Sequence, residues 1–295
     1  MSKSKVIIIT GGTGGIGYQA ALALASKPEK HTVVVTGRSQ GSGEKAVASL
    51  KEATGNPNIE YAVADMSAQK NVTALGKDLL KRFPKIDELI NNAGNLTTGE
   101  KEQAPDGVDK NFAVNVIAPL ILTRALVPAL KAASPKGRVQ ITSGGMPFDT
   151  LKVGDLESVT FAVGIPAYSH SKRVMEAMAI SLAEELKPEG IVVNVVGGAV
   201  AAATGMTSAM SFKDMPWMMK PLYPLLKLFA FRPDNNKSAF TAAEPAIAAV
   251  LATPEELGGT GQSLLSYPKV GSFKPEVLDQ DNQAAVMKYV EEKLV

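Results

Sequence analysis

Tyr168 and Lys172 stand four residues apart in a segment of helical pattern, so their side chains share one face of a helix. A tyrosine hydroxyl has an ordinary pKa of about 10 and is a poor acid or base at neutral pH. A neighbouring ammonium favours the phenolate and lowers that pKa. Such a pair can give a proton to a carbonyl oxygen, or take one from an alcohol, while a hydride is transferred. Taken alone, the same spacing is also typical of an exposed surface pair.

Two further polar residues lie where they can join this pair. Ser143 closes an apolar run, and the two glycines after it leave room for a substrate beside its hydroxyl. Asn115 lies inside an apolar helical pattern, where a buried amide needs hydrogen-bond partners. Two interpretations of Asn115 stay open: a helix kink satisfied by backbone groups, and a water-mediated link to Lys172. Ser143 by itself is an ordinary residue for the end of a strand.

Short runs rich in valine and isoleucine alternate with helical patterns along the chain. The runs lack strict polar alternation, as expected for strands that are covered on both faces. We predict strands over residues 5–10, 32–37, 59–65, 87–94, 138–143 and 191–198, with a weaker last strand near Gln262. Helical patterns cover residues 44–54, about 109–133 and about 168–187. This order predicts an α/β fold, a single Rossmann-type doubly wound parallel sheet of about seven strands with helices on both faces.

A glycine-rich turn over residues 10–17 joins the first predicted strand to a helix. Its glycines allow a tight turn, and the helix N-terminus offers free N–H groups and a positive dipole end to a pyrophosphate. The competing interpretation is a tight strand-to-helix connection without a ligand. The candidate cofactor residues of this turn are Gly11, Thr13, Gly15, Ile16 and Gly17.

The second predicted strand is followed by Arg38 and Ser39. An acidic residue at this place would bind the ribose 2′-hydroxyl of NAD, whereas a guanidinium suits the 2′-phosphate of NADP. We therefore expect NADP(H) to be preferred over NAD(H), with Arg38 and Ser39 at the cofactor. The alternative is a solvated surface arginine.

The overall composition excludes several classes of site. The 295 residues carry a net charge of +2 without a basic stripe, which indicates no nucleic-acid partner. The chain lacks cysteine and has two histidines, His31 and His170, so we predict no metal site. No apolar stretch reaches the roughly 18–20 residues of a membrane-spanning helix. The apolar run near the start is too short for a secretory signal, so we expect a cytoplasmic protein with a single domain over residues 1–295.

Taken as a set, these residues resemble the short-chain dehydrogenase/reductase family. The matching elements are the glycine turn, Asp65 after the third strand, the Asn-Asn-Ala-Gly run at residues 91–94, and the polar residues described above. Their order and spacing match over about residues 5–198. Within the family the chain resembles retinol-dehydrogenase-like and carbonyl-reductase-like members.

The resemblance implies roles for individual residues. Asp65 and Met66 would hold the adenine ring, and Asn92, Ala93 and Gly94 would line the adenine-ribose side. The implied catalytic tetrad consists of Asn115, Ser143, Tyr168 and Lys172, of which Tyr168 and Lys172 would also contact the nicotinamide ribose.

Three features depart from the family pattern. The interval between Ser143 and Tyr168 is long, which predicts an inserted loop over about residues 144–166. Gly197 and Gly198 stand where the family carries Pro-Gly, and the threonine that usually follows has only an offset counterpart, Thr204. We keep Gly198 and Thr204 as candidate nicotinamide contacts.

Residues 199–233 contain many apolar side chains flanked by lysines and an arginine. Three interpretations compete: ordinary core packing, a helical lid over an apolar substrate, and shallow docking to a membrane or partner. Residues 280–295 predict an amphipathic helix with a packing or subunit-contact role. The resembled family makes either a homodimer or a monomer plausible here.

The sequence as a whole predicts an NADP(H)-dependent oxidoreductase that interconverts a carbonyl and an alcohol on a hydrophobic substrate, with Tyr168 as general acid and base. One alternative is NADPH-dependent reduction of an activated carbon–carbon double bond. Another is a non-catalytic NADP-binding sensor or scaffold.

Overall fold

The computed structural model of the protein describes residues 3–144, 150–158, 163–197, 211–215, 217–225, 236–253, 255–266 and 269–295. A single eight-stranded sheet in the order β3-β2-β1-β4-β5-β6-β7-β8 forms its centre. The strands are β1 (Val6–Ile9), β2 (Thr32–Gly37), β3 (Ile59–Val63), β4 (Glu88–Asn91), β5 (Arg138–Ser143), β6 (Val192–Gly197), β7 (Ser263–Ser266) and β8 (Lys269–Gly271).

Strands β1 to β7 pair in parallel, as predicted, because each is followed by a crossover that returns over a face of the sheet. The sequence predicted about seven strands, and β8 was missed. This strand has three residues and pairs antiparallel with β7, so it offers too short a pattern to recognise. The doubly wound α/β fold is otherwise confirmed.

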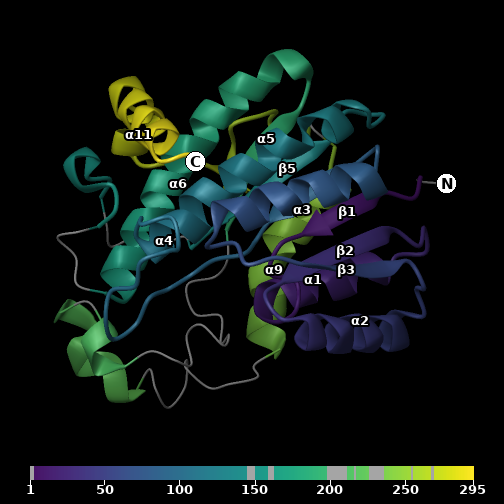
Figure 1. Cartoon of the computed structure of the whole chain (residues 1–295), viewed down its shortest axis with the longest axis horizontal. Helices are drawn as coiled ribbons and strands as arrows, with labels where there is room; N and C mark the ends of the chain where they lie inside the picture. Colours follow the sequence, from purple (N-terminus) through teal and green to yellow (C-terminus); the bar gives the residue numbers. More distant parts are fainter. Residues whose placement is uncertain are drawn as a thin grey trace.

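Helices cover both faces of the sheet (Figure 1). One core cluster joins the sheet to α3, α5, α6 and α11, and a second joins it to α1, α2 and α9. The bounds are α1 (Gly15–Ala25), α2 (Gln40–Thr54), α3 (Gln69–Arg82), α4 (Lys110–Phe112), α5 (Ala118–Lys131), α6 (Ile165–Leu186), α9 (Asn236–Leu251), α10 (Pro275–Leu278) and α11 (Gln280–Glu292). The expected C-terminal helix is therefore present as α11, and it packs against α6.

The predicted helix over residues 109–133 is interrupted. Asp109 caps α4 by accepting from the N–H of Phe112, and a π-helical segment, Ala113–Ile117, separates α4 from α5. Within the described residues, Lys110–Lys131 is long and apolar enough to span a membrane by length and composition, but 72% of that window is buried inside the fold. It is explained as a core helix, because it contributes to the cluster between the sheet, α3 and α6.

The strand order places the candidate site. The chain winds outward in both directions from β1 and β4, and the carboxyl ends of such a pair are where a doubly wound sheet places its ligand. The glycine turn follows β1, and the Asn-Asn-Ala-Gly run follows β4. Ser143 ends β5 and pairs in register with Gly197 at the end of β6. The sequence motifs therefore meet along one edge of the sheet.

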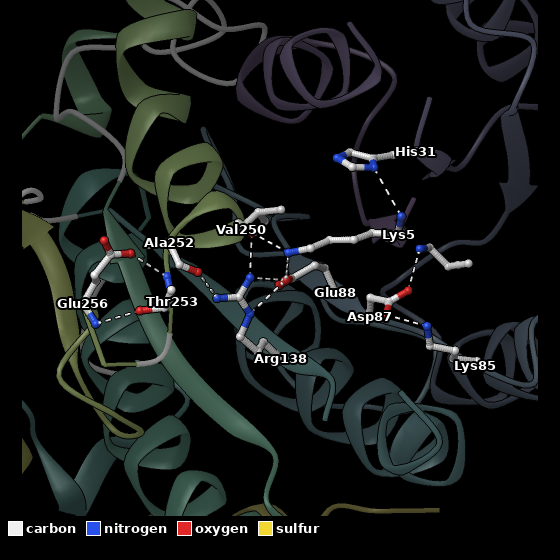
Figure 2. A network of polar contacts seen from close by, with 11 residues as sticks. Lys5, His31, Lys85, Asp87, Glu88, Arg138, Val250, Ala252, Thr253 and Glu256 are labelled. Atoms are coloured by element: carbon white, nitrogen blue, oxygen red, sulfur yellow. Dashed lines mark hydrogen bonds and ion pairs between the residues drawn. The ribbon is translucent and has the colours of Figure 1, made fainter. Parts of the chain in front are cut away.

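The opposite, amino-terminal edge of the sheet holds a buried ionic cluster (Figure 2). Glu88 accepts from Lys5 Nζ at 2.9 Å and from Arg138 Nε at 2.8 Å. Arg138 also donates to the carbonyls of Val250 and Ala252, each at 2.6 Å. These carbonyls lie at the C-terminus of α9, where a helix leaves acceptors unpaired and a cation is favourable. The cluster thus ties α9 to β1, β4 and β5.

Candidate active site

The glycine turn after β1 has a backbone that few other residues could adopt. Gly11 has φ +66°, in the left-handed region. A Cβ on Gly17 would lie 2.5 Å from the carbonyl oxygen of Gly11, so a side chain there would displace backbone. Thr13 lies within the turn, and Gly15, Ile16 and Gly17 begin α1. The five candidate residues therefore form one compact turn.

The N-terminus of α1 has the features of a pyrophosphate site. Its N-cap residue is Gly14, and no side chain caps the helix. A Cβ on Gly14 would meet no atom within 4 Å, so the space in front of the helix is open. The first N–H groups of a helix need acceptors, and an anion satisfies them. These residues fit the diphosphate of a dinucleotide.

The run after β4 is fastened to the glycine turn. The hydroxyl of Thr10 accepts from the N–H of Asn92 at 3.0 Å and of Ala93 at 2.9 Å. The side-chain amide of Asn92 donates to the carbonyl of Thr10 at 2.9 Å. Asn92, Ala93 and Gly94 are half-buried, and their contact with the adenine-ribose side of a cofactor stays a prediction. In the described contacts Asn92 supports the backbone of the turn.

Arg38 and Ser39 follow β2 at the same edge of the sheet. The hydroxyl of Ser39 caps α2 by accepting from the N–H of Ser42 at 3.3 Å. This cap explains why α2 begins at Gln40, four residues before the predicted start. Arg38 is exposed, and no ion pair or hydrogen bond of its guanidinium occurs in the described part of the chain. That cation is therefore available to a phosphate.

Asp65 and Met66 lie after β3. A carboxylate oxygen of Asp65 accepts from the N–H of Ser67 at 3.0 Å and from its hydroxyl at 2.9 Å, which fixes a local turn. The side chain of Met66 is buried in the core cluster on the α3 face. The structure thus gives both residues a structural role, and their contact with an adenine ring stays a prediction.

Tyr168 lies in the first turn of α6, against the end of β5. A Cβ on Gly144 would lie 3.0 Å from the tyrosine ring and 3.4 Å from its hydroxyl oxygen, which puts that hydroxyl beside the residue that follows Ser143. Lys172 Nζ lies 5.6 Å from the ring centroid and donates to the carbonyl of Thr142 at 2.8 Å. Tyr168, Lys172 and Ser143 are therefore brought together, as predicted.

The protonation of this pair differs from the sequence expectation. Burial raises the pKa of Tyr168 to about 12, so the phenol is neutral at physiological pH. Burial also lowers the pKa of Lys172 to about 8, against an opposing effect of the nearby Glu176 carboxylate. The expected lowering of the tyrosine pKa is absent because burial of the phenol is the dominant effect. The hydroxyl of Tyr168 therefore keeps its proton in the described structure.

Glu176 is a site residue that the sequence reasoning missed. Ser143 Oγ donates to Glu176 Oε1 at 2.6 Å, and Arg173 Nη1 donates to the other carboxylate oxygen at 2.6 Å. Glu176 is 0% exposed. The available signal was its spacing: Tyr168, Lys172 and Glu176 recur every four residues on α6, and a glutamate interrupts an otherwise apolar stripe.

Asn115 lies in the π-helical segment. Its side-chain oxygen accepts from the N–H of Asn95 at 2.8 Å, and its amide donates to the carbonyl of Asn95 and to Ser171 Oγ, both at 2.9 Å. These contacts agree with the first of the two interpretations, a helix irregularity with backbone partners, and the water-mediated link to Lys172 stays a prediction. Ser171 donates in turn to the carbonyl of Tyr168, so Asn115 steadies the start of α6.

The described part of the inserted loop, residues 150–158, is fastened to the catalytic helix by His170. One ring nitrogen accepts from the N–H of Lys152 at 3.0 Å, and the other lies 2.8 Å from Ser158 Oγ. Burial lowers the pKa of His170 to about 4, so the ring is neutral and can accept at one nitrogen while it donates at the other. The predicted loop is therefore attached two residues from Tyr168.

Most of the predicted lid, with Gly198 and Thr204, lies outside the described residues. In its described part the buried carboxylate of Asp214 accepts from the N–H of Gly99 at 3.0 Å and from the hydroxyl of Ser211 at 2.6 Å. Phe212, Leu222 and Leu225 are between 50% and 58% exposed. Ordinary core packing therefore does not describe Leu222 and Leu225, whereas it does describe Met215, which is 3% exposed.

The sequence of this chain is similar to those of known proteins. The family model for short chain dehydrogenases matches residues 5–214. The human dehydrogenase/reductase SDR family member 12 is 34% identical over 170 residues, which cover 57% of this chain and 52% of that protein. Retinol dehydrogenase 13 of Mus musculus is 27% identical over 287 residues, covering 94% and 80%. The chain spans about half the length of the first curated relatives that it matches.

A solved structure shares the fold. The complex of Pseudomonas aeruginosa RhlG with NADP superposes with a TM-score of 0.63 at 22% identity, covering 88% of this chain and 94% of that one. At this identity the likeness concerns the sheet and its helices.

Proposed function

Because the chain belongs to the short-chain dehydrogenase family, we propose that it is an NADP(H)-dependent oxidoreductase that interconverts a carbonyl and an alcohol on a hydrophobic substrate. The observation that carries this proposal is the meeting of Tyr168, Lys172 and Ser143 at the carboxyl end of β5, on the sheet edge that also carries the glycine turn after β1. The hydrophobic substrate is supported by the apolar side chains of the lid and by a relative that is named a retinol dehydrogenase.

Different residues of this chain would perform different parts of such a reaction. NADP(H), when bound, supplies or accepts the hydride. The neutral phenol of Tyr168 protonates the carbonyl oxygen in reduction, and its phenolate takes that proton back in oxidation. Lys172, bonded to Thr142, places a cation near the ring and stabilises the phenolate. Ser143 contacts the reacting oxygen from the end of β5, and Asn115 fixes the turn of α6 that carries Tyr168.

A screen of NADPH oxidation tests the proposal. Hydrophobic aldehydes and ketones of graded size are supplied to the purified protein, and the loss of reduced cofactor is followed by absorbance. We expect turnover with bulky apolar carbonyls and little with small polar ones. Tight NADPH binding without turnover of any carbonyl would instead favour the non-catalytic sensor or scaffold. Reduction of an enone at its carbon–carbon bond would favour the double-bond reductase.

The preference for NADP(H) rests on Arg38. We expect Arg38→Asp to weaken NADPH binding at least about tenfold more than NADH binding, because a charge-assisted contact with the 2′-phosphate is lost. Dissociation constants for both cofactors, from fluorescence titration, give this comparison. The matched control is Lys45→Asp, which changes the same charge on exposed residues of α2. Equal weakening of both cofactors would mean that Arg38 is surface charge only.

We also propose that the protein is cytoplasmic and is a homodimer or a monomer. A separate proposal concerns its lid, which would contact anionic membranes. Lys220 Nζ lies 5.4 Å from the ring centroid of Phe212, so a cation accompanies exposed apolar side chains. We expect co-sedimentation with vesicles that contain phosphatidylserine, weakened by salt and by Leu222→Glu with Leu225→Glu. Equal recovery of wild type and double variant with the vesicles would contradict this contact.

A further inference from the structure

The hydroxyl of Ser143 has a partner that competes with any substrate. Ser143 is 2% exposed and Glu176 is 0% exposed, and the two side chains are joined at 2.6 Å. The second carboxylate oxygen of Glu176 is held by Arg173 in an ion pair. Each carboxylate oxygen of Glu176 therefore has its own donor, Ser143 on one side and Arg173 on the other.

The hydrogen bond between Ser143 and Glu176 has a defined direction: Ser143 Oγ donates, and Glu176 Oε1 accepts. Serine has one hydroxyl proton, and it is therefore directed at Glu176. What Ser143 can offer to a ligand in this state is its remaining lone pairs. The neutral hydroxyl of Tyr168, close to Gly144, is available as a donor at the same place.

We propose that Glu176 is a positioning residue that makes Ser143 a hydrogen-bond acceptor, so that the site binds an alcohol in preference to the corresponding carbonyl. This inference rests on the proposed function. An alcohol can accept from the hydroxyl of Tyr168 and donate its own proton to Ser143. A carbonyl has no proton to donate, so it accepts from Tyr168 alone and gains no hydrogen bond from Ser143 unless it draws the serine proton away from Glu176.

The Glu176→Gln variant should reverse the direction of the hydrogen bond with Ser143, while the side chain at position 176 keeps nearly the same shape. Arg173 only donates, so the amide oxygen of the glutamine faces it, and the amide nitrogen faces Ser143. Ser143 then accepts from the glutamine, and its proton becomes free for a ligand. We expect carbonyl binding to strengthen and alcohol binding to weaken. The ratio of the alcohol to the carbonyl dissociation constant should rise about tenfold, as expected for the exchange of one hydrogen bond in each complex.

Binding of matched pairs measures this ratio without turnover. Menthol with menthone, and retinol with retinal, are titrated against cofactor-free protein by the fluorescence of Trp217, the one tryptophan of the chain. Each alcohol is also titrated in the presence of NADPH and each carbonyl in the presence of NADP⁺, where no reaction can proceed. The matched control is Glu184→Gln, which alters an exposed glutamate of the same helix.

The outcomes separate this inference from the proposed function. A raised ratio in Glu176→Gln, and its absence when Ser143→Ala is added, supports the assignment. If the ratio is unchanged and the enzyme turns these compounds over, the assignment of Glu176 is wrong and the proposed function stands. If none of the ligands binds in any state, the proposed function and the inference both fail. Should Glu176→Gln not fold by circular dichroism, Glu176→Asp, which withdraws the carboxylate from Ser143, must raise the same ratio.

Discussion

Replacing Tyr168 by phenylalanine should lower kcat for carbonyl reduction at least about a hundredfold, because it removes the group that protonates the reacting oxygen. The ring remains, so its packing against Gly144 and the approach of Lys172 are kept. NADPH affinity should stay within about threefold of the wild type, since the glycine turn and Arg38 are untouched. Steady-state kinetics and a cofactor titration on the same preparation give both values.

The matched control for this variant is Tyr18→Phe. Tyr18 lies on α1, and its hydroxyl bonds with Ser49 at 2.8 Å, away from the site. Its loss should leave kcat unchanged. Full activity in Tyr168→Phe would show that the proton comes from another group. An equal loss in both variants would point to a general effect of removing a tyrosine hydroxyl.

Replacing Arg138 by alanine should cost about 3–5 kcal/mol of unfolding free energy, the typical result of leaving one partner of a buried ion pair behind. Glu88 would lose its strongest buried partner, and the carbonyls of Val250 and Ala252 would lose a donor (Figure 2). Lys5 compensates only in part, because its ammonium is partly solvated and bonds to the same carboxylate oxygen. Chemical denaturation of the two proteins measures the difference.

The control is the double variant Glu88→Leu with Arg138→Met, which removes both buried charges and fills their volume. Much of the stability should return, because an apolar pair of similar size often replaces a buried ion pair at no cost. A loss below about 1 kcal/mol in Arg138→Ala would mean that the cluster behaves like an exposed ion pair.

Much of the fold could be predicted because its signals are local. Valine- and isoleucine-rich runs end at turn residues, and two of the strands, β2 and β5, have the predicted bounds. The π-helical segment before α5 could not be read in the same way. It depends on partners that Asn115 finds in Asn95 and Ser171, which are distant in sequence. Likewise, β8 depends on its pairing with β7.

The site, like the fold, contains residues that the sequence alone could reveal and others that it could not. Tyr168, Lys172 and Ser143 were found because their side chains carry their own chemistry and because, as a set, their order and spacing match a family pattern. Glu176 was missed, since a glutamate on a helix is ordinarily a solvated residue, and only the fold shows that it points at Ser143. The protonation of Tyr168 was also mistaken, because spacing indicates a nearby ammonium but not the burial that outweighs it.

The attachment of the inserted loop through His170 limits how this protein can be re-engineered. A designer who grafts a foreign loop between β5 and α6 removes the main-chain and hydroxyl groups that the imidazole holds. The helix that bears the phenol then loses a brace within one turn of it. In acid the folded state loses stability: the ring of His170 stays neutral in the fold down to about pH 4, whereas the unfolded chain takes up a proton below about pH 6.5. Chimeras that keep Lys152, Ser158 and His170 together should preserve turnover while exchanging the rest of the loop.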